Sequence, residues 1–200
     1  MKKCFLIVIS ALIYINVYPQ GVDKGTIDYG ITFGIYCPMY DISQSVGLGA
    51  EAGVFGAWIF SRDFYLVTSP QLSVNMQHKF KTRFAYADLP VSLGYQWGIV
   101  HLALGPQYSV CLSSGADYDW WPDKLNYWSL MLDISLYGSP QAYAHSNALP
   151  MMGFKLGYGL TKVKYSCIYD NMDVFDPKYA DINSRPVTFA LYFRIPLKRK

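Results

Sequence analysis

The sequence predicts an all-β protein that closes into a barrel of eight antiparallel strands and spans a membrane. Three observations lead to this prediction. Apolar and polar residues alternate with period two along most of the chain beyond residue 25, as in strands with two unlike faces. Charged residues make up only 16% of the chain, whereas aromatic residues reach 17% and Tyr is the most frequent of them. The connections between the strands, with one exception, alternate between short turns and longer loops.

The first element is a signal peptide over residues 1 to 20. A basic start with Lys2 and Lys3 precedes an apolar run from Cys4 to Tyr18 that only Ser10 and Asn16 interrupt. The run is short for a membrane-spanning helix, which needs about 20 residues. We therefore expect export, cleavage near residues 18 to 21, and a barrel domain over residues 21 to 200. An uncleaved anchor is the alternative.

Eight strands follow in order. They are expected at residues 26 to 36, 46 to 60, 63 to 77, 83 to 97, 99 to 112, 149 to 160, 162 to 170 and 186 to 197. The third is the clearest, because its polar side from Ser69 to Gln77 is too continuous for a protein core. Pro70, Pro90 and Pro106 remove ladder hydrogen bonds within three strands, so we expect bulges or breaks there.

The connections orient the predicted barrel. Those at 61 to 62, near 98 and near 161 are tight, and they fall on one side if the N-terminus is periplasmic. Transmembrane barrels have short periplasmic turns and longer outer loops. Residues 37 to 45, 113 to 148 and 171 to 185 then become outer loops, the second of them very long; residues 78 to 82 form a short outer loop and are the exception.

A soluble sandwich or lipocalin-like barrel would also show alternation. Its water-facing side should carry many Lys and Glu, whereas here the polar side consists mainly of Gly, Ser, Thr, Gln and Asn. Aromatic residues also gather toward the turn side, as in the girdle of a membrane barrel. The predicted girdle consists of Tyr29, Trp58, Phe60, Phe64, Tyr95, Trp97, Tyr158, Tyr165 and Phe193.

The sequence resembles the PorT-type outer-membrane β-barrel family of Bacteroidetes over most of residues 26 to 195. The resemblance rests on Gly53-Val54-Phe55 to Phe60, Phe64-Tyr65-Leu66 with Ser69-Pro70-Gln71-Leu72, Tyr86-Ala87-Asp88-Leu89-Pro90-Val91, Leu104-Gly105-Pro106-Gln107 and Gly153-Phe154-Lys155-Leu156-Gly157-Tyr158-Gly159. It implies an eight-stranded barrel in the Gram-negative outer membrane. The family takes its name from a member linked to protein secretion and gliding. The segment 113 to 148 and the basic tail 196 to 200 depart from its pattern.

Charged residues on the inward side of the predicted strands are expected to form a polar network in the lumen. An eight-stranded barrel has an interior that side chains just fill, so buried charges there must pair. Asp28, Arg194 and Glu51 should lie close together near the turn-side ends of neighbouring strands. Structural ion pairing is favoured over a gated conduit or a binding site. The network would comprise Asp28, Glu51, Asp88, His101, Lys155, Lys162, Lys164, Asp170 and Arg194.

No pattern of catalytic, metal-binding or cofactor-binding residues emerges. Ser113, Ser114 and His145 share the long loop and His101 lies in a strand, but nothing at fixed spacing forms a triad. We expect no enzyme and no cofactor; a lipid-modifying enzyme ranks third among the functions considered. Cys37, Cys111 and Cys167 are expected as free thiols, with one disulfide as the alternative.

The expected function is structural or based on interactions, with outer loops that contact a partner, a glycan or a lipid. The candidate contact surface is Tyr118, Trp120, Trp121, Tyr127 and Trp128, since exposed aromatic residues at this density mark contact sites. The alternative is a loop that packs on itself or extends strands above the membrane. A transport or secretion-accessory barrel is the second function considered. The formal charge of +3 provides no footprint for nucleic acid.

Overall fold

The computed structural model describes residues 25, 27–41, 45–61, 63–78, 81–97, 100–117, 120–137, 151–169 and 178–199. Its strands are β1 (Ile27–Asp41), β2 (Ser45–Ile59), β3 (Phe64–Thr68), β4 (Gln71–Gln77), β5 (Thr82–Trp97), β6 (Val100–Ala116), β7 (Trp120–Lys124), β8 (Tyr127–Tyr137), β9 (Met151–Gly159), β10 (Val163–Tyr169), β11 (Lys178–Ser184) and β12 (Val187–Arg199). Within these ranges no helix is long and apolar enough to cross a membrane. The predicted signal peptide lies outside the described residues.

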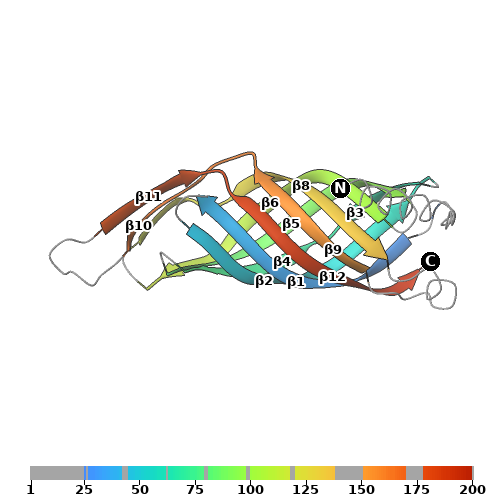
Figure 1. Cartoon of the computed structure of the whole chain (residues 1–200), viewed down its shortest axis with the longest axis horizontal. Helices are drawn as coiled ribbons and strands as arrows, with labels where there is room; N and C mark the ends of the chain where they lie inside the picture. Colours follow the sequence, from blue (N-terminus) through green and yellow to red (C-terminus); the bar gives the residue numbers. More distant parts are fainter. Residues whose placement is uncertain are drawn as a thin grey trace, which may run out of the picture.

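One sheet closes on itself to form the barrel wall (Figure 1). Its order is β1, β12, β9, β8, β6, β5, then β3 and β4, then β2, which pairs with β1 again. β3 and β4 share one place in the ring, because each pairs with β2 on one side and β5 on the other. The wall therefore has eight strand positions with antiparallel neighbours, and the predicted eight-stranded barrel is confirmed.

One of the eight predicted strands lies outside the wall, and one wall strand is not predicted. β8 lies within residues 113 to 148, predicted as a long outer loop, and it pairs with β6 and β9 in the wall. Residues 162 to 170, predicted as a wall strand, instead form β10 of a separate sheet with the order β11-β10-β7. β8 does alternate, but Tyr127 and Met131 on its inward side conceal the polar character of that side.

The two ends of the barrel differ. Short gaps separate β2 from β3 and β5 from β6, and the strand ends that flank them lie at the same end of the wall, whereas β10 and β11 project beyond the opposite rim (Figure 1). Short turns mark the periplasmic end of a transmembrane barrel, so the three-stranded sheet lies on the outer side. The turn near residue 161 also lies at this outer rim, not at the periplasmic end as predicted, since the Leu160 amide donates to the Trp128 carbonyl over 2.7 Å.

The outward face of the wall is an apolar belt. Ile35, Leu48, Leu104 and Leu191 are 55%, 65%, 51% and 43% exposed, respectively. Among the described outward side chains of the wall strands, only Arg83 carries a charge, and it lies near the outer rim. Water-soluble monomers rarely expose an apolar surface of this extent, whereas the hydrocarbon core of a bilayer would cover it.

The predicted aromatic girdle is correct for one end only. Tyr29, Trp58, Phe64, Tyr95 and Trp97 are exposed at the short-turn end, and Phe60 contacts Trp58 at 5.6 Å between ring centroids. The other three predicted members lie elsewhere. Phe193 is halfway along β12 with its ring stacked on Phe33, Tyr158 is exposed at the outer rim, and Tyr165 is buried in β10.

The prolines mark irregular pairing, as predicted. Ser69 and Pro70 separate β3 from β4, and the Thr68 hydroxyl donates to the Pro90 carbonyl across this break over 2.8 Å. Pro106 stays within β6, but the pairing of β5 with β6 passes directly from Pro90–Gln107 to Leu93–Leu104.

Candidate functional site

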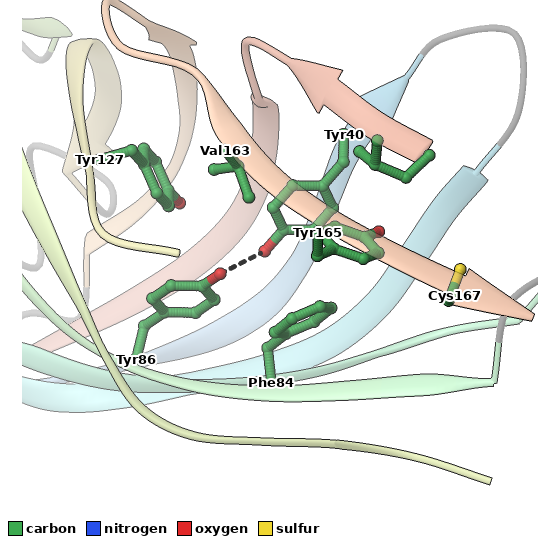
Figure 2. Close-up of a cluster of buried hydrophobic side chains, with 8 residues drawn as sticks. Tyr40, Phe84, Tyr86, Tyr127, Val163, Tyr165 and Cys167 are labelled. Atoms are coloured by element: carbon green, nitrogen blue, oxygen red, sulfur yellow. Dashed lines mark hydrogen bonds between the residues drawn. The ribbon is translucent and has the colours of Figure 1, made fainter. Parts of the chain in front are cut away.

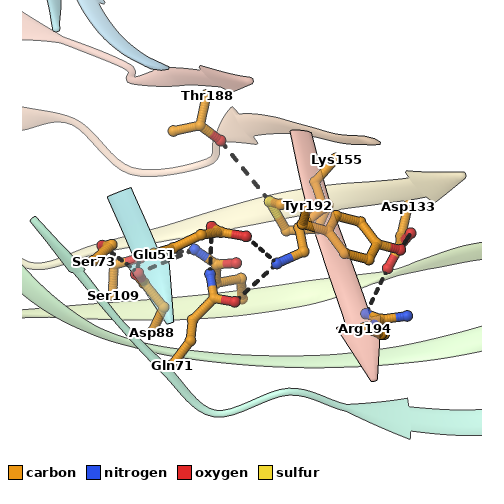
Figure 3. Close-up of polar contacts among 12 residues, drawn as sticks. Glu51, Gln71, Ser73, Asp88, Ser109, Asp133, Lys155, Thr188, Tyr192 and Arg194 are labelled. Carbon is orange, nitrogen blue, oxygen red and sulfur yellow. Dashed lines mark hydrogen bonds and ion pairs between the residues drawn. The ribbon is translucent and has the colours of Figure 1, made fainter. Parts of the chain in front are cut away.

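The centre of the barrel interior holds a buried ion pair (Figure 3). Lys155 on β9 lies 2.6 Å from Glu51 on β2, and both side chains are 3% or less exposed. The Gln71 amide joins the two: its oxygen accepts from the Lys155 ammonium over 2.8 Å, and its nitrogen donates to the other Glu51 oxygen over 2.8 Å. A buried charge needs such compensation, since the interior offers no bulk water.

A second buried pair lies nearer the periplasmic end. Arg194 on β12 is 2.8 Å from Asp133 on β8, and the Tyr192 hydroxyl donates to the same carboxylate. The guanidinium carbon of Arg194 also lies 4.6 Å from the Tyr192 ring centroid, and the Lys155 ammonium lies 4.7 Å from it. Tyr192 thus stands between the two ion pairs and contacts both cations.

Asp133 is not among the predicted lumen residues, because residue 133 falls in the predicted loop of residues 113 to 148. The predicted neighbours of Arg194 are Asp28 and Glu51, near the turn-side ends of their strands. The structure instead gives Arg194 the Asp133 partner and gives Glu51 the Lys155 partner. The signal that identifies Asp133 is the alternation of β8, where Leu132 and Ile134 on either side point outward.

Asp88 forms a third polar group, held by neutral donors. The Ser73 and Ser109 hydroxyls each donate to its carboxylate over 2.6 Å, and the Gln107 amide donates over 3.3 Å. The carboxylate is buried between β4 and β6 on the interior side of β5. These three polar groups occupy successive levels of the barrel and cross-link seven of its eight strand positions.

An aromatic cluster closes the outer mouth (Figure 2). It consists of Tyr40, Phe84, Tyr86, Tyr127, Val163, Tyr165, Cys167 and Ile182, all buried. The wall provides the first four, whereas β10 and β11 provide the rest, so the outer sheet folds its apolar side over the barrel end. Tyr40 donates to Tyr86 over 3.2 Å, and Tyr165 donates to Gln77 over 2.7 Å. Burial, with a smaller contribution from Asp181, raises the pKa of the Cys167 thiol to about 11.

A smaller cluster fills the periplasmic end. Ile59, Tyr65, Val67 and Ala103 are buried there, and the Tyr65 ring lies 5.4 Å from the ring of the buried His101. The Tyr65 ring also covers Gly94, where a Cβ atom would collide with it. Apolar or aromatic layers therefore lie above and below the ion pairs.

The predicted lumen residues are only partly brought together. Asp28, Glu51, Asp88, His101, Lys155 and Arg194 are buried in the interior. The placement of Lys162 and Lys164 in the lumen is wrong: both are exposed beside or on β10, outside the wall. Their neighbours Val163 and Tyr165 point into the aromatic cluster, which turns the lysines outward. Asp170 lies outside the described residues.

The predicted contact surface is also divided. Trp121 on β7 and Trp128 on β8 are 52% and 47% exposed. Tyr127, predicted on the surface, is instead 1% exposed within the aromatic cluster. Trp120 starts β7, and Tyr118 lies outside the described residues. Trp128 packs against Tyr108 at 4.6 Å between ring centroids, at the outer edge of the belt.

Two cavities flank the outer end of β6. The first, of about 710 Å³, is an apolar groove among outward residues such as Leu48, Val74 and Ala85. The second, of about 640 Å³, is mixed in character, and Asp123, Lys124, Asn126, Trp128 and Thr161 are among its lining residues. Ser113 and Ser114 line both.

The described part of the chain brings together few side chains that could act in catalysis or bind a metal ion. No group of three His, Cys, Asp or Glu side chains is placed to hold a metal ion there. Ser113 and Ser114 line the outer cavities, His101 is buried, and His145 lies outside the described residues. Cys37, Cys111 and Cys167 are free thiols.

Comparison with known proteins gives a likeness in structure but none in sequence. No family model and no curated protein matches the sequence. Among solved structures, the chain is similar to the solid-state NMR structure of outer membrane protein AlkL in DMPC lipid bilayers. The TM-score is 0.50 at 10% identity, with 90% of this chain and 93% of the other covered. The chain therefore has the fold of an outer-membrane β-barrel, as the sequence predicts.

Proposed function

We propose that this chain is a closed outer-membrane barrel with a structural or interaction role, and that its outer sheet of β7, β10 and β11 carries the contact surface. The observation behind the proposal is the filled interior. Two buried ion pairs, the Asp88 group and the aromatic cluster succeed one another along the axis. A solute would have to displace each of them.

Conductance in planar bilayers tests the proposal. We expect no stable channel from the refolded protein over minutes at 100 mV. A variant with Tyr86→Ala and Tyr127→Ala should show brief openings, because both rings stand in the outer mouth. Tyr95→Ala, at an exposed position in the periplasmic girdle, is the matched control and should stay silent. A steady open channel in the unaltered protein would support a transport role instead.

We also propose that the chain is not an enzyme. A hydrolase or acyltransferase of the outer membrane would need a histidine beside a nucleophilic serine. In the described residues, neither cavity at Ser113 and Ser114 is lined by a histidine. An unchanged lipid A profile is expected in cells that carry His101→Ala or His145→Ala; a change in acylation or phosphorylation with either would contradict the proposal.

Membership of the PorT-type family of Bacteroidetes remains a proposal of the same kind. Its support is the set of short motifs in fixed order, several of which fall on wall strands: Pro90 on β5, Pro106 on β6 and Gly153–Gly159 on β9. The test is co-purification from a native outer membrane: a secretion-accessory barrel should bring a secretion component with it.

A further inference from the structure

A basic patch lies directly above the outer edge of the apolar belt. It comprises Lys124 on β7, Lys162 and Lys164 beside and on β10, and Arg185 after β11, all exposed. Lys124 and Lys164 are direct partners in the antiparallel pairing of β7 with β10. Partners of this kind point to the same face with Cβ atoms about 5 Å apart, and like charges there repel. An anion between them would relieve the repulsion.

The patch lies at the membrane boundary. Arg185 donates to the Tyr158 hydroxyl over 3.4 Å. Tyr158 is 50% exposed near the outer end of β9, at the edge of the apolar belt. Lys162 follows Thr161, whose hydroxyl accepts from the Trp128 amide over 2.9 Å. Tyr and Trp side chains sit at the level of lipid headgroups in barrels of this kind. The cations are therefore at the level of the outer-leaflet headgroups.

Among the residues that the structure describes, the acids on this side do not neutralise the patch. Asp123 and Asp181 are the exposed acids described here, against four exposed cations. Asp181 pairs with Ser166, and so stands beyond Lys164 on the side away from the belt. The positive charge is thus concentrated next to the membrane, where an anionic headgroup would meet it.

The mixed cavity beside the patch has a size and a lining that suit a sugar. Its volume of about 640 Å³ falls in the range of small-molecule sites, about 300 to 1,000 Å³. Lys124 connects it to the patch, Trp128 provides an aromatic wall, and Asp123 and Asn126 offer groups that can bind hydroxyls. A phospholipid headgroup such as glycerol would leave most of this cavity unused.

We propose that the basic patch and the mixed cavity bind the phosphorylated sugar headgroup of one outer-leaflet glycolipid, whose acyl chains lie against the belt. This inference rests on the proposed placement of the barrel in an outer membrane. The phosphate lies between Lys124 and Lys164, with Arg185 at the rim, and the sugar ring enters the cavity beside Trp128.

Native mass spectrometry of the full barrel in detergent micelles tests the proposal. The probes are a bisphosphorylated, acylated glucosamine disaccharide, its dephosphorylated form, its deacylated form and phosphatidylglycerol. We expect the first probe to bind at least tenfold more tightly than each of the others. Lys124→Gln with Lys164→Gln should abolish this preference, whereas Arg83→Gln, which removes an exposed cation on the other flank of β6, should leave it unchanged.

Each other outcome contradicts a defined part of the proposal. Equal binding of the dephosphorylated lipid, or an unchanged preference in the double lysine variant, would refute the role of the patch. Equal binding of phosphatidylglycerol would refute sugar recognition, and equal binding of the deacylated sugar would refute a lipid source. Folding of every variant is checked by heat-modifiable migration on a gel. A barrel that never inserts into vesicles would instead contradict the proposed function.

Discussion

The buried pair of Lys155 and Glu51 should contribute strongly to the stability of the barrel. Lys155→Met removes a 2.6 Å ion pair and a 2.8 Å hydrogen bond. The Glu51 carboxylate, at 3% exposure, keeps the hydrogen bond from the Gln71 amide (Figure 3). Removal of one partner of a buried pair costs about 3 to 5 kcal/mol. The unfolding constant should therefore rise by about two to three and a half powers of ten.

The double variant separates pairing from packing. Glu51→Gln removes the carboxylate charge that Lys155→Met leaves without its lysine partner. The double variant should therefore be at least about 2 kcal/mol more stable than the sum of the two single losses indicates. The assay is urea unfolding of the barrel refolded in vesicles, followed by tryptophan fluorescence and by heat-modifiable gel migration. Leu156→Met, on the outward side of the same strand at 41% exposure, is the control. A loss below about 1 kcal/mol for Lys155→Met, or simple additivity in the double variant, would refute this reasoning.

Three further predictions address the belt, the outer mouth and the periplasmic end. Leu104→Arg should destabilise the folded barrel by about 2 to 4 kcal/mol in the same assay, whereas Leu112→Arg near the outer rim should cost about 1 kcal/mol or less; equal losses would contradict a membrane-spanning belt. In a variant that keeps Cys167 as its only cysteine, labelling by a water-soluble maleimide at pH 8 should be at least a hundredfold slower in the folded barrel than in urea. Because the pKa of this thiol is raised to about 11, its thiolate fraction should increase about tenfold per pH unit up to that value; rapid labelling of the folded protein would show that the outer mouth is open. Gly94→Val should cost about 1 to 3 kcal/mol, because the new side chain would displace the Tyr65 ring, and Tyr65→Ala should remove most of that extra loss; an unaffected Gly94→Val barrel would contradict the packing.

Much of the wall could be predicted from the sequence because strand alternation is a local property. A strand in a barrel wall faces lipid on one side and the lumen on the other, so each residue reports its own side. The inward positions of Glu51, Asp88 and Lys155 and the outward position of Leu104 followed from their neighbours alone. The count of eight strands agreed with the structure, although two segments exchanged roles.

That exchange shows where the local signal fails. β10 alternates with the period of a wall strand, although more weakly, because one side meets the aromatic cluster and the other meets water. A short amphipathic strand has the same pattern in both settings, and only the lysines at 162 and 164 distinguish it. β8 was missed for the opposite reason, since Tyr127 and Met131 make its inward side partly apolar.

The amino-acid pattern is sufficient to predict a closed antiparallel barrel with an apolar outer face and charges inside. These features depend on whether each side chain meets lipid or the lumen, and the period of the alternation records that difference. Which charges meet is visible only in the folded barrel: Arg194 with Asp133, Glu51 with Lys155, and Lys124 opposite Lys164. Pairs of this kind depend on strand order and register, which bring together residues far apart in the chain and leave no trace in local periodicity.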